Sequence, residues 1–143
     1  MSEVENRNKE TQWKSIYKLG GIAAILSLIA IVLDIVIGSS MGANLSALPQ
    51  TAADRFVQFQ QSPWLGLYNL DLLNTVIQMI SIPVYFALYA VHRKTNKPYA
   101  LLALIVFLMG ATIFITTNTA LPMLDLSRKY AVAKESQRTL LAA

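Results

Sequence analysis

The chain has 143 residues, of which 55% are hydrophobic and only 14% are charged, and its mean hydropathy is +0.46. Soluble domains usually carry about 25% charged residues, so this composition argues against a soluble protein and for a membrane protein of one domain, 1–143. The absence of cysteine excludes disulfides and cysteine-held metals, and the net charge of +4 does not indicate nucleic-acid binding, because the basic residues adjoin apolar runs.

The first predicted element is a transmembrane helix over residues 17–42. Leu19–Ser40 contains a single charge, Asp34, and is about 20 residues or longer, which is the length that an α-helix needs to cross a bilayer. Trp13 and Tyr17 precede it one turn apart, where aromatic rings favour the membrane interface. The apolar run exceeds the 7–15 residues of a signal peptide, so we interpret it as a signal-anchor helix.

Small residues recur on one face of this helix at spacings of three, four or seven. They are Gly20, Ala24, Ser27, Gly38 and Gly42. Pairs of small residues four apart allow helices to approach closely in lipid, so this face is predicted to pack against another helix. Asp34 shares the face. An ionised carboxylate near the bilayer centre costs at least ~2.5–3.5 kcal/mol, so we expect Asp34 to be neutral or hydrogen-bonded.

Residues 51–61 (TAADRFVQFQQ) are predicted to form a short amphipathic helix in the outer loop. Thr51 is a cap-like residue with Asp54 three positions later. Ser62 and Pro63 then give a start signal for a second transmembrane helix over residues 63–92. Pro83 interrupts that helix, and we expect a kink there.

The third transmembrane helix is predicted over residues 98–119, with Pro98 in its first turn and Pro122 stopping it. Tyr99–Pro122 contains no charge. Residues 124–143 form a second amphipathic segment. Both amphipathic segments either lie along the membrane surface or pack on the ends of the transmembrane helices. The predicted fold class is therefore all-α, an integral membrane bundle of three transmembrane helices.

Lysine and arginine indicate the orientation. They fill the N-terminal head and the 93–97 connection, whereas the 43–62 connection has only Arg55. The positive-inside rule places the head and the 93–97 turn in the cytoplasm. The C-terminus then lies outside, although its tail is also basic.

The second helix carries a continuous row of polar and tyrosine side chains. At 100° per residue, they fall within about 120° of arc. This polar stripe consists of Asp71, Asn74, Thr75, Gln78, Ser81, Tyr85, Tyr89 and His92. Lipid would tolerate it poorly, so it must face protein or water. It serves either as hydrogen-bonding contacts within the bundle, or as a cavity for a ligand, ion or proton centred on Asp34 and Asp71, or as a docking face for another subunit.

Two catalytic or metal-binding interpretations are weak. Gly38-Ser39-Ser40-Met41-Gly42 matches the pattern of a hydrolase nucleophile elbow, but that motif needs a strand–turn–helix context and a histidine partner. His92 is the sole histidine and adjoins basic residues, as in a membrane anchor. The sequence therefore predicts no catalytic residue and no metal site, and it identifies no cofactor.

The second half of the chain resembles a known family. The segments are FALYAVHRKTNKPYALLAL and NTALPMLDLSRKYAVAKESQRTLLAA. They are similar to prokaryotic multi-pass membrane proteins grouped as domain of unknown function 4386. The residues that carry the resemblance are Asp71, Leu88, Tyr89, Arg93, Asn118, Met123, Leu124, Ser127, Tyr130, Ala131, Ala133, Gln137, Arg138, Leu140 and Leu141. The resemblance implies a multi-pass fold in a prokaryotic inner membrane and no defined activity. Relatives continue into further helices, so a later helix or another chain would complete any cavity.

The leading hypothesis is a non-enzymatic membrane protein that serves as an accessory or structural subunit of a larger complex. Its partners would be the lipid bilayer and other membrane subunits or copies of itself. The alternative is a binder or transporter of a small molecule, ion or proton that uses the polar stripe.

Overall fold

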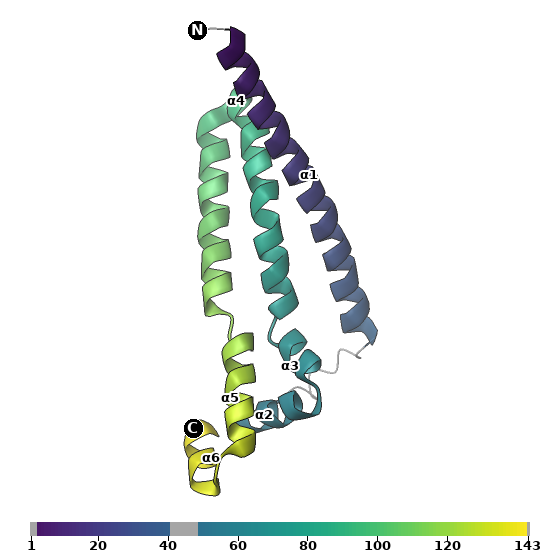
Figure 1. Cartoon of the computed structure of the whole chain (residues 1–143), viewed down its shortest axis with the longest axis vertical. Helices are drawn as coiled ribbons and strands as arrows, with labels where there is room; N and C mark the ends of the chain where they lie inside the picture. Colours follow the sequence, from purple (N-terminus) through teal and green to yellow (C-terminus); the bar gives the residue numbers. More distant parts are fainter. Residues whose placement is uncertain (1–2, 41–48, 143) are drawn as a thin grey trace. The chain divides into compact units, whose positions relative to one another are not determined.

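The computed structural model describes residues 3–40 and 49–142, and in these ranges it contains helices and no strand. The helices are α1 (Glu3–Ser40), α2 (Ala52–Gln61), α3 (Pro63–Asn69), α4 (Leu72–Thr117), α5 (Ala120–Val132) and α6 (Glu135–Ala142) (Figure 1). The all-α class is thus confirmed. Two stretches are helical, long and apolar enough to cross a membrane, Trp13–Ser40 and Leu72–Val132.

Helix α1 begins earlier than the apolar run that predicts it. It starts at Glu3, so the polar head continues directly into the apolar segment. No proline or glycine precedes Gly20, and nothing in the head therefore stops a helix. The C-terminal end of the predicted span, including Gly42, lies outside the described residues.

The start signals of α2 and α3 are confirmed. The Thr51 hydroxyl accepts a hydrogen bond from the Asp54 amide (3.1 Å), and the Asp54 carboxylate accepts one from the Thr51 amide (3.2 Å). The Ser62 hydroxyl caps α3 by accepting from the Leu65 amide (3.4 Å), and Pro63 follows at the first helical position. These are local interactions between near neighbours, which is why the sequence alone predicts them.

The single helix predicted over residues 63–92 is interrupted. Helix α3 ends at Asn69, and Asp71 adopts a left-handed backbone with φ 60° and ψ 28° before α4 begins. Aspartate tolerates this conformation better than most residues. The Asp71 amide donates to the Tyr68 carbonyl (3.0 Å), and the Asp71 carbonyl accepts from the Thr75 amide (3.0 Å). Asp71 therefore lies between two helices rather than within one.

Helix α4 contains one reversal of chain direction. Its only non-helical backbone is at Asn96 (φ −147°, ψ 77°), whereas Pro83, where we expect a kink, lies within the helical part of the chain before it. Asparagine is favoured just before a helix, and Pro98 stands in the following first turn. We call residues 72–95 the first arm and residues 97–117 the second arm. The rings of Tyr85 and Phe107 stack with centroids 3.6 Å apart, which places the arms side by side (Figure 1).

The chain divides into two units. The first unit comprises Met1–Asp34 and Val76–Thr116, and the second comprises Ile35–Thr75 and Thr117–Ala143. In the first unit, α1 runs antiparallel to the first arm. The Trp13 ring lies 3.5 Å from the Arg93 guanidinium carbon, and the Ser27 and Ser81 hydroxyls are 3.5 Å apart. Residue numbers thus rise along α1 as they fall along the first arm.

The second unit has a small core of its own. Phe56 and Phe59 of α2 are 1% and 2% exposed. The Ser127 hydroxyl of α5 donates to the Phe56 carbonyl (3.0 Å), and the Tyr130 ring lies 4.9 Å from the Phe56 ring. Gly66 of α3 packs directly against the Phe59 ring, at a distance that leaves no room for a side chain. The two phenylalanines of α2 are therefore covered by the chain itself.

The C-terminal part also departs from the predicted boundaries. Helix α4 ends at Thr117, and Pro122 lies in the first turn of α5 instead of stopping a helix. The Asn118 side chain bridges this break, because its amide nitrogen donates to the Leu70 carbonyl (2.7 Å) and its oxygen accepts from the Ala120 amide (3.0 Å). The predicted 124–143 segment consists of two helices, α5 and α6, separated at residues 133–134.

Candidate functional site

The start of the polar stripe lies in the second unit, where its groups bond to one another. The Asn74 side chain donates to the Asp71 carboxylate (3.3 Å), and the buried Thr75 hydroxyl donates to the Asp71 carbonyl (3.0 Å). The Asp71 side chain itself is exposed. This end of the stripe therefore satisfies much of its hydrogen bonding locally, through the turn between α3 and α4.

The rest of the stripe lies in the first unit and faces several neighbours. The Ser81 hydroxyl donates to the Ile77 carbonyl (2.8 Å) and lies 3.5 Å from the Ser27 hydroxyl of α1. Tyr85 stacks on Phe107 of the second arm. Gln78 and Tyr89 are half-buried, and His92 is exposed. Side chains that share one arc of the first arm thus contact either α1 or the second arm of α4. The stripe therefore does not form a single polar surface.

Asp34 and Asp71, on which the sequence centres a possible cavity, belong to different units. Asp34 is half-buried at the end of the first unit, and Asp71 lies in the second.

The packing face of α1 in the structure differs from the predicted face at one position, where Ala23 is buried in place of Ala24. Gly20, Ala23 and Ser27 are buried, whereas Ala24 is exposed. A side chain on Gly20 would collide with the Ala87 side chain and would come within 3.1 Å of the Pro83 carbonyl. Gly38, in the second unit, lies close to the Tyr68 hydroxyl, which would be 3.0 Å from an added Cβ. Gly42 lies outside the described residues.

Two other glycines face open space. A Cβ added to Gly21 of α1, or to Gly110 of the second arm, would meet nothing within 4 Å. Glycine inside a helix is roughly 1 kcal/mol less favourable than alanine, and the packing of this chain does not require glycine at either position. In membranes, such small residues allow a neighbouring helix to approach closely.

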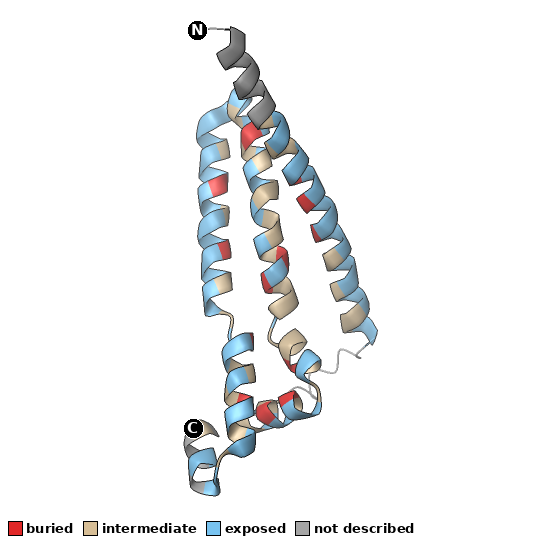
Figure 2. Ribbon diagram, viewed as in Figure 1, coloured by how far each residue is buried: buried red, intermediate tan, exposed pale blue. Residues whose placement is uncertain are grey.

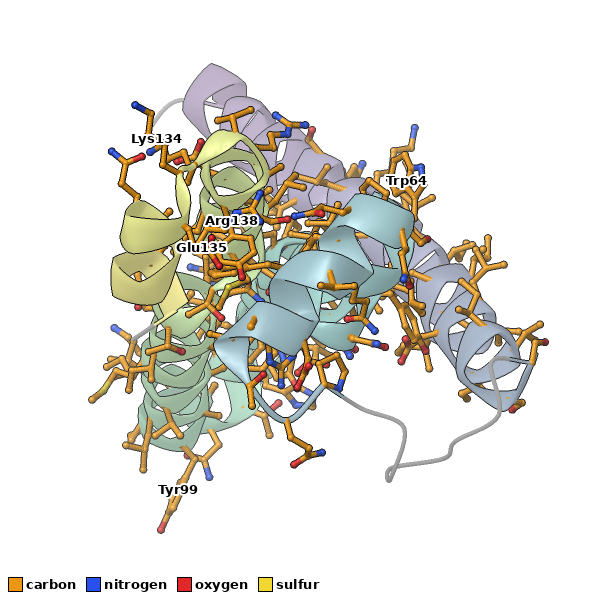
Figure 3. The ribbon with its side chains drawn as sticks, turned by 90° about the horizontal axis from the view of Figure 1, so that it is seen from below. Trp64, Tyr99, Lys134, Glu135 and Arg138 are labelled. Carbon is orange, nitrogen blue, oxygen red and sulfur yellow. The ribbon has the colours of Figure 1, made fainter. Side chains whose placement is uncertain are left out.

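A groove lies between the two arms of α4 beside the Asn96 turn, with a volume of about 340 Å³. We call it the aromatic groove. It is lined by Tyr85, Leu88, Tyr89, His92, Asn96, Tyr99, Ala100, Ala103 and Leu104. Tyr99 is 72% exposed and points away from the ribbon (Figure 3), whereas Leu104 is buried. The groove is therefore open, and its surface is almost entirely apolar, although His92, Asn96 and Tyr99 beside the turn carry polar groups.

The hydrolase-like motif does not have the geometry of a nucleophile elbow. Ser39 and Ser40 lie in the last turn of α1, and their hydroxyls donate to the Ile35 (2.6 Å) and Val36 (2.7 Å) carbonyls. A nucleophile elbow instead requires a sharp strand-to-helix turn. Among the residues that the structure describes, no three His, Asp or Glu side chains gather as a metal site would require.

The polar stripe predicts three of the groove residues, Tyr85, Tyr89 and His92, but not the groove itself. Tyr99 and Leu104 join them only because the chain reverses at Asn96. The sequence signal for this reversal is Asn96 followed two residues later by Pro98, a pattern that marks a helix start.

These features define an all-helical protein with two stretches suited to crossing a membrane. No protein family, curated protein or solved structure matches this chain in the three comparisons. The functional inferences therefore rest on the residues and contacts described above.

Proposed function

We propose that this chain is a non-enzymatic integral membrane protein that crosses the bilayer three times and serves as an accessory subunit of a larger membrane complex. The three spans would be α1 and the two arms of α4. Each arm has about 20 residues or more, which suffices for a ~30 Å hydrocarbon core at 1.5 Å per residue. The reversal at Asn96 supports this count, because it divides one long apolar stretch into two.

The observation that carries the accessory role is the uncovered surface of these helices. Within the most apolar part of each candidate span, only 17% and 11% of the residues are buried, and Figure 2 shows exposed residues along most of α1 and α4. Gly21 and Gly110 interrupt that apolar surface with open notches. Contact with lipid does not require glycine at these positions, whereas a transmembrane helix of another subunit can pack closely against small residues. The partner we propose is an apolar transmembrane helix of another subunit.

The remaining elements fit the same proposal. Helices α2, α5 and α6 would lie on the outer side of the membrane, and the exposed Trp64 (81% exposed; Figure 3) would sit at the interface, as tryptophan does. The resemblance to domain of unknown function 4386 supports a prokaryotic inner membrane as the location. The N-terminus would be cytoplasmic and the C-terminus outside.

One observation favours the alternative of a ligand binder. The aromatic groove contains Tyr85 and Tyr89 of the polar stripe and opens beside the basic 93–97 turn. A groove of this size lies within the range of ligand sites, roughly 300–1,000 Å³. Binding there would not compete with a helix at Gly21, because Gly21 lies on α1.

The orientation can be measured directly, since the chain has no cysteine. Single cysteines are introduced by Thr95→Cys in the exposed turn of α4 and by Gln50→Cys in the outer loop. Because basic segments stay in the cytoplasm, an impermeant thiol reagent should label only the Gln50→Cys protein in intact cells. Permeabilised cells provide the control, in which both proteins must react. Labelling of the Thr95→Cys protein alone in intact cells would invert the topology.

The accessory role is tested by the composition of the purified particle. We expect the native protein, extracted in mild detergent, to carry another membrane chain in fixed stoichiometry. Gly110→Leu and Gly21→Leu should remove that chain, because each leucine fills a notch that the partner occupies. Ile22→Leu, a volume-conserving change at a side chain that is 57% exposed, should retain it.

The alternative outcomes are equally specific. A particle that contains only copies of this chain, around a polar cavity, would favour the binder or transporter. A particle with the same foreign chain in wild type and in both leucine variants would show that the notches are not the docking surface.

A further inference from the structure

We propose that the aromatic groove binds one acyl chain and the head group of an anionic phospholipid. The proposal requires that the chain lies in a membrane, but it does not require a partner subunit. It concerns the end of the first unit where α4 reverses at Asn96.

The groove has an apolar surface that suits an acyl chain, and it ends beside a turn that carries polar and basic residues. Its floor is apolar, with Leu104 buried and Ala103 beside it, and the stacked pair Tyr85–Phe107 lies at the end of the groove remote from the turn. Its rim at the turn carries an imidazole, an amide and a phenol, from His92, Asn96 and Tyr99. A hydrocarbon chain fits the floor, and an oxygen-rich head group fits the rim.

The groove is open along its side. Leu88 is 47% exposed and Tyr85 is 40% exposed, so a ligand there remains in contact with the surrounding lipid. The volume of about 340 Å³ is at the small end of ligand sites. These dimensions suit one chain of a lipid that enters from the bilayer, rather than a water-soluble molecule that must be enclosed.

Charge complementarity selects an anionic head group. The turn contributes Lys94 and Lys97, next to Arg93, whose guanidinium lies over the Trp13 ring, and residues 92–99 include no acid. The contact between Trp13 and Arg93 brings the adjoining Lys14 of α1 to the same end. The second arm also begins at this turn, so the positive end of its helix dipole lies there. Basic pockets between transmembrane helices on the cytoplasmic side are suited to anionic lipid head groups.

The experiment titrates the purified full-length protein in detergent with phosphatidylglycerol or with phosphatidylcholine of the same acyl chains, and it counts bound lipids by native mass spectrometry. We expect one phosphatidylglycerol per chain to bind at least about ten-fold more tightly than phosphatidylcholine, since each nearby basic residue contributes roughly five-fold. Lys97→Gln should remove about one such factor and leave the thermal stability unchanged.

A second variant tests the groove apart from its charge. Ala103→Trp places an indole on the groove floor and should abolish binding of the lipid. Leu102→Trp is the matched control, because Leu102 is 57% exposed on the same arm and does not line the groove, so it should bind as wild type does. Thermal unfolding of both variants is measured alongside, and equal stability is required for the comparison.

Three results would overturn the proposal. Equal affinity for the two lipids would remove the charge selectivity. Unchanged binding by Ala103→Trp, or equal loss in both tryptophan variants, would show that the groove is not the site. Complete displacement of the lipid by millimolar inorganic phosphate would indicate an anion site without a lipid chain. None of these results bears on the partner subunit, whose binding is measured through Gly21 and Gly110.

Discussion

Replacing Phe56 by alanine is expected to destabilise the second unit by about 3–5 kcal/mol, which is the cost of truncating a buried phenylalanine. The Phe56 side chain is 1% exposed and contacts the Tyr130 ring. The Phe56 carbonyl accepts a hydrogen bond from the buried Ser127 hydroxyl. The second unit has few buried large side chains among its described residues, chiefly Phe56 and Phe59. It therefore cannot readily repack around the cavity that the substitution leaves.

Hydrogen exchange of the α2 and α5 amides in detergent measures this effect, since it reports the opening of one unit. Val57→Ala is the matched control, because Val57 is the next residue on α2 and is 45% exposed. It should change the exchange rates little, whereas Phe56→Ala should increase them by two to three orders of magnitude or more. If the two variants exchange alike, α2 does not pack on α5 as described.

The helix starts were predictable from the sequence because the interactions that define them are local. Thr51 with Asp54, and Ser62 with Pro63, act within four residues and need no tertiary contact. The apolar runs likewise predicted α1 and both arms of α4. The break at Asp71 was not predictable in the same way, because its left-handed backbone is accessible to aspartate but is not dictated by it.

The partners of each helix face required the structure. Gly20 and Gly21 are adjacent and identical in the sequence, yet one is packed against Ala87 and the other faces open space. Ala23 is buried where Ala24 was expected, because the two residues lie on opposite sides of the line from Gly20 to Ser27, and the spacing alone does not show which side faces the neighbouring helix. The aromatic groove depends on the pairing of Tyr85 with Phe107, residues that come together only through the reversal at Asn96.

Several residues that carry the family resemblance make specific contacts in the second unit. Asn118 bridges the break before α5, Ser127 bonds to Phe56, and Arg138 lies over the Tyr130 ring at 5.4 Å. These contacts give the sequence pattern a structural reason, which is the packing of α5 and α6 onto the rest of the unit.

The second large effect is expected at Gly20. Gly20→Leu should destabilise the packing of α1 on the first arm by about 3 kcal/mol or more, at the upper end of the range for overpacking. A side chain at Gly20 collides with Ala87 and approaches the Pro83 carbonyl. Because the Ala87 Cβ is attached directly to the backbone of α4, the collision cannot be relieved by turning a flexible side chain, and the helices must separate.

Gly21→Leu makes the comparison direct, because it adds the same side chain one residue later where nothing lies within 4 Å. In the isolated chain it should not lower stability, and removing a glycine from the helix should raise it by up to about 1 kcal/mol. The Trp13 fluorescence reports the contact with Arg93 at the same interface, provided that Trp64, the only other tryptophan, is replaced by phenylalanine in every protein compared. Its emission should shift in Gly20→Leu and stay as in wild type in Gly21→Leu. Equal shifts in both variants would mean that α1 is rotated relative to the packing described, and the notch at Gly21 would then be part of the internal seam and not a surface for a partner.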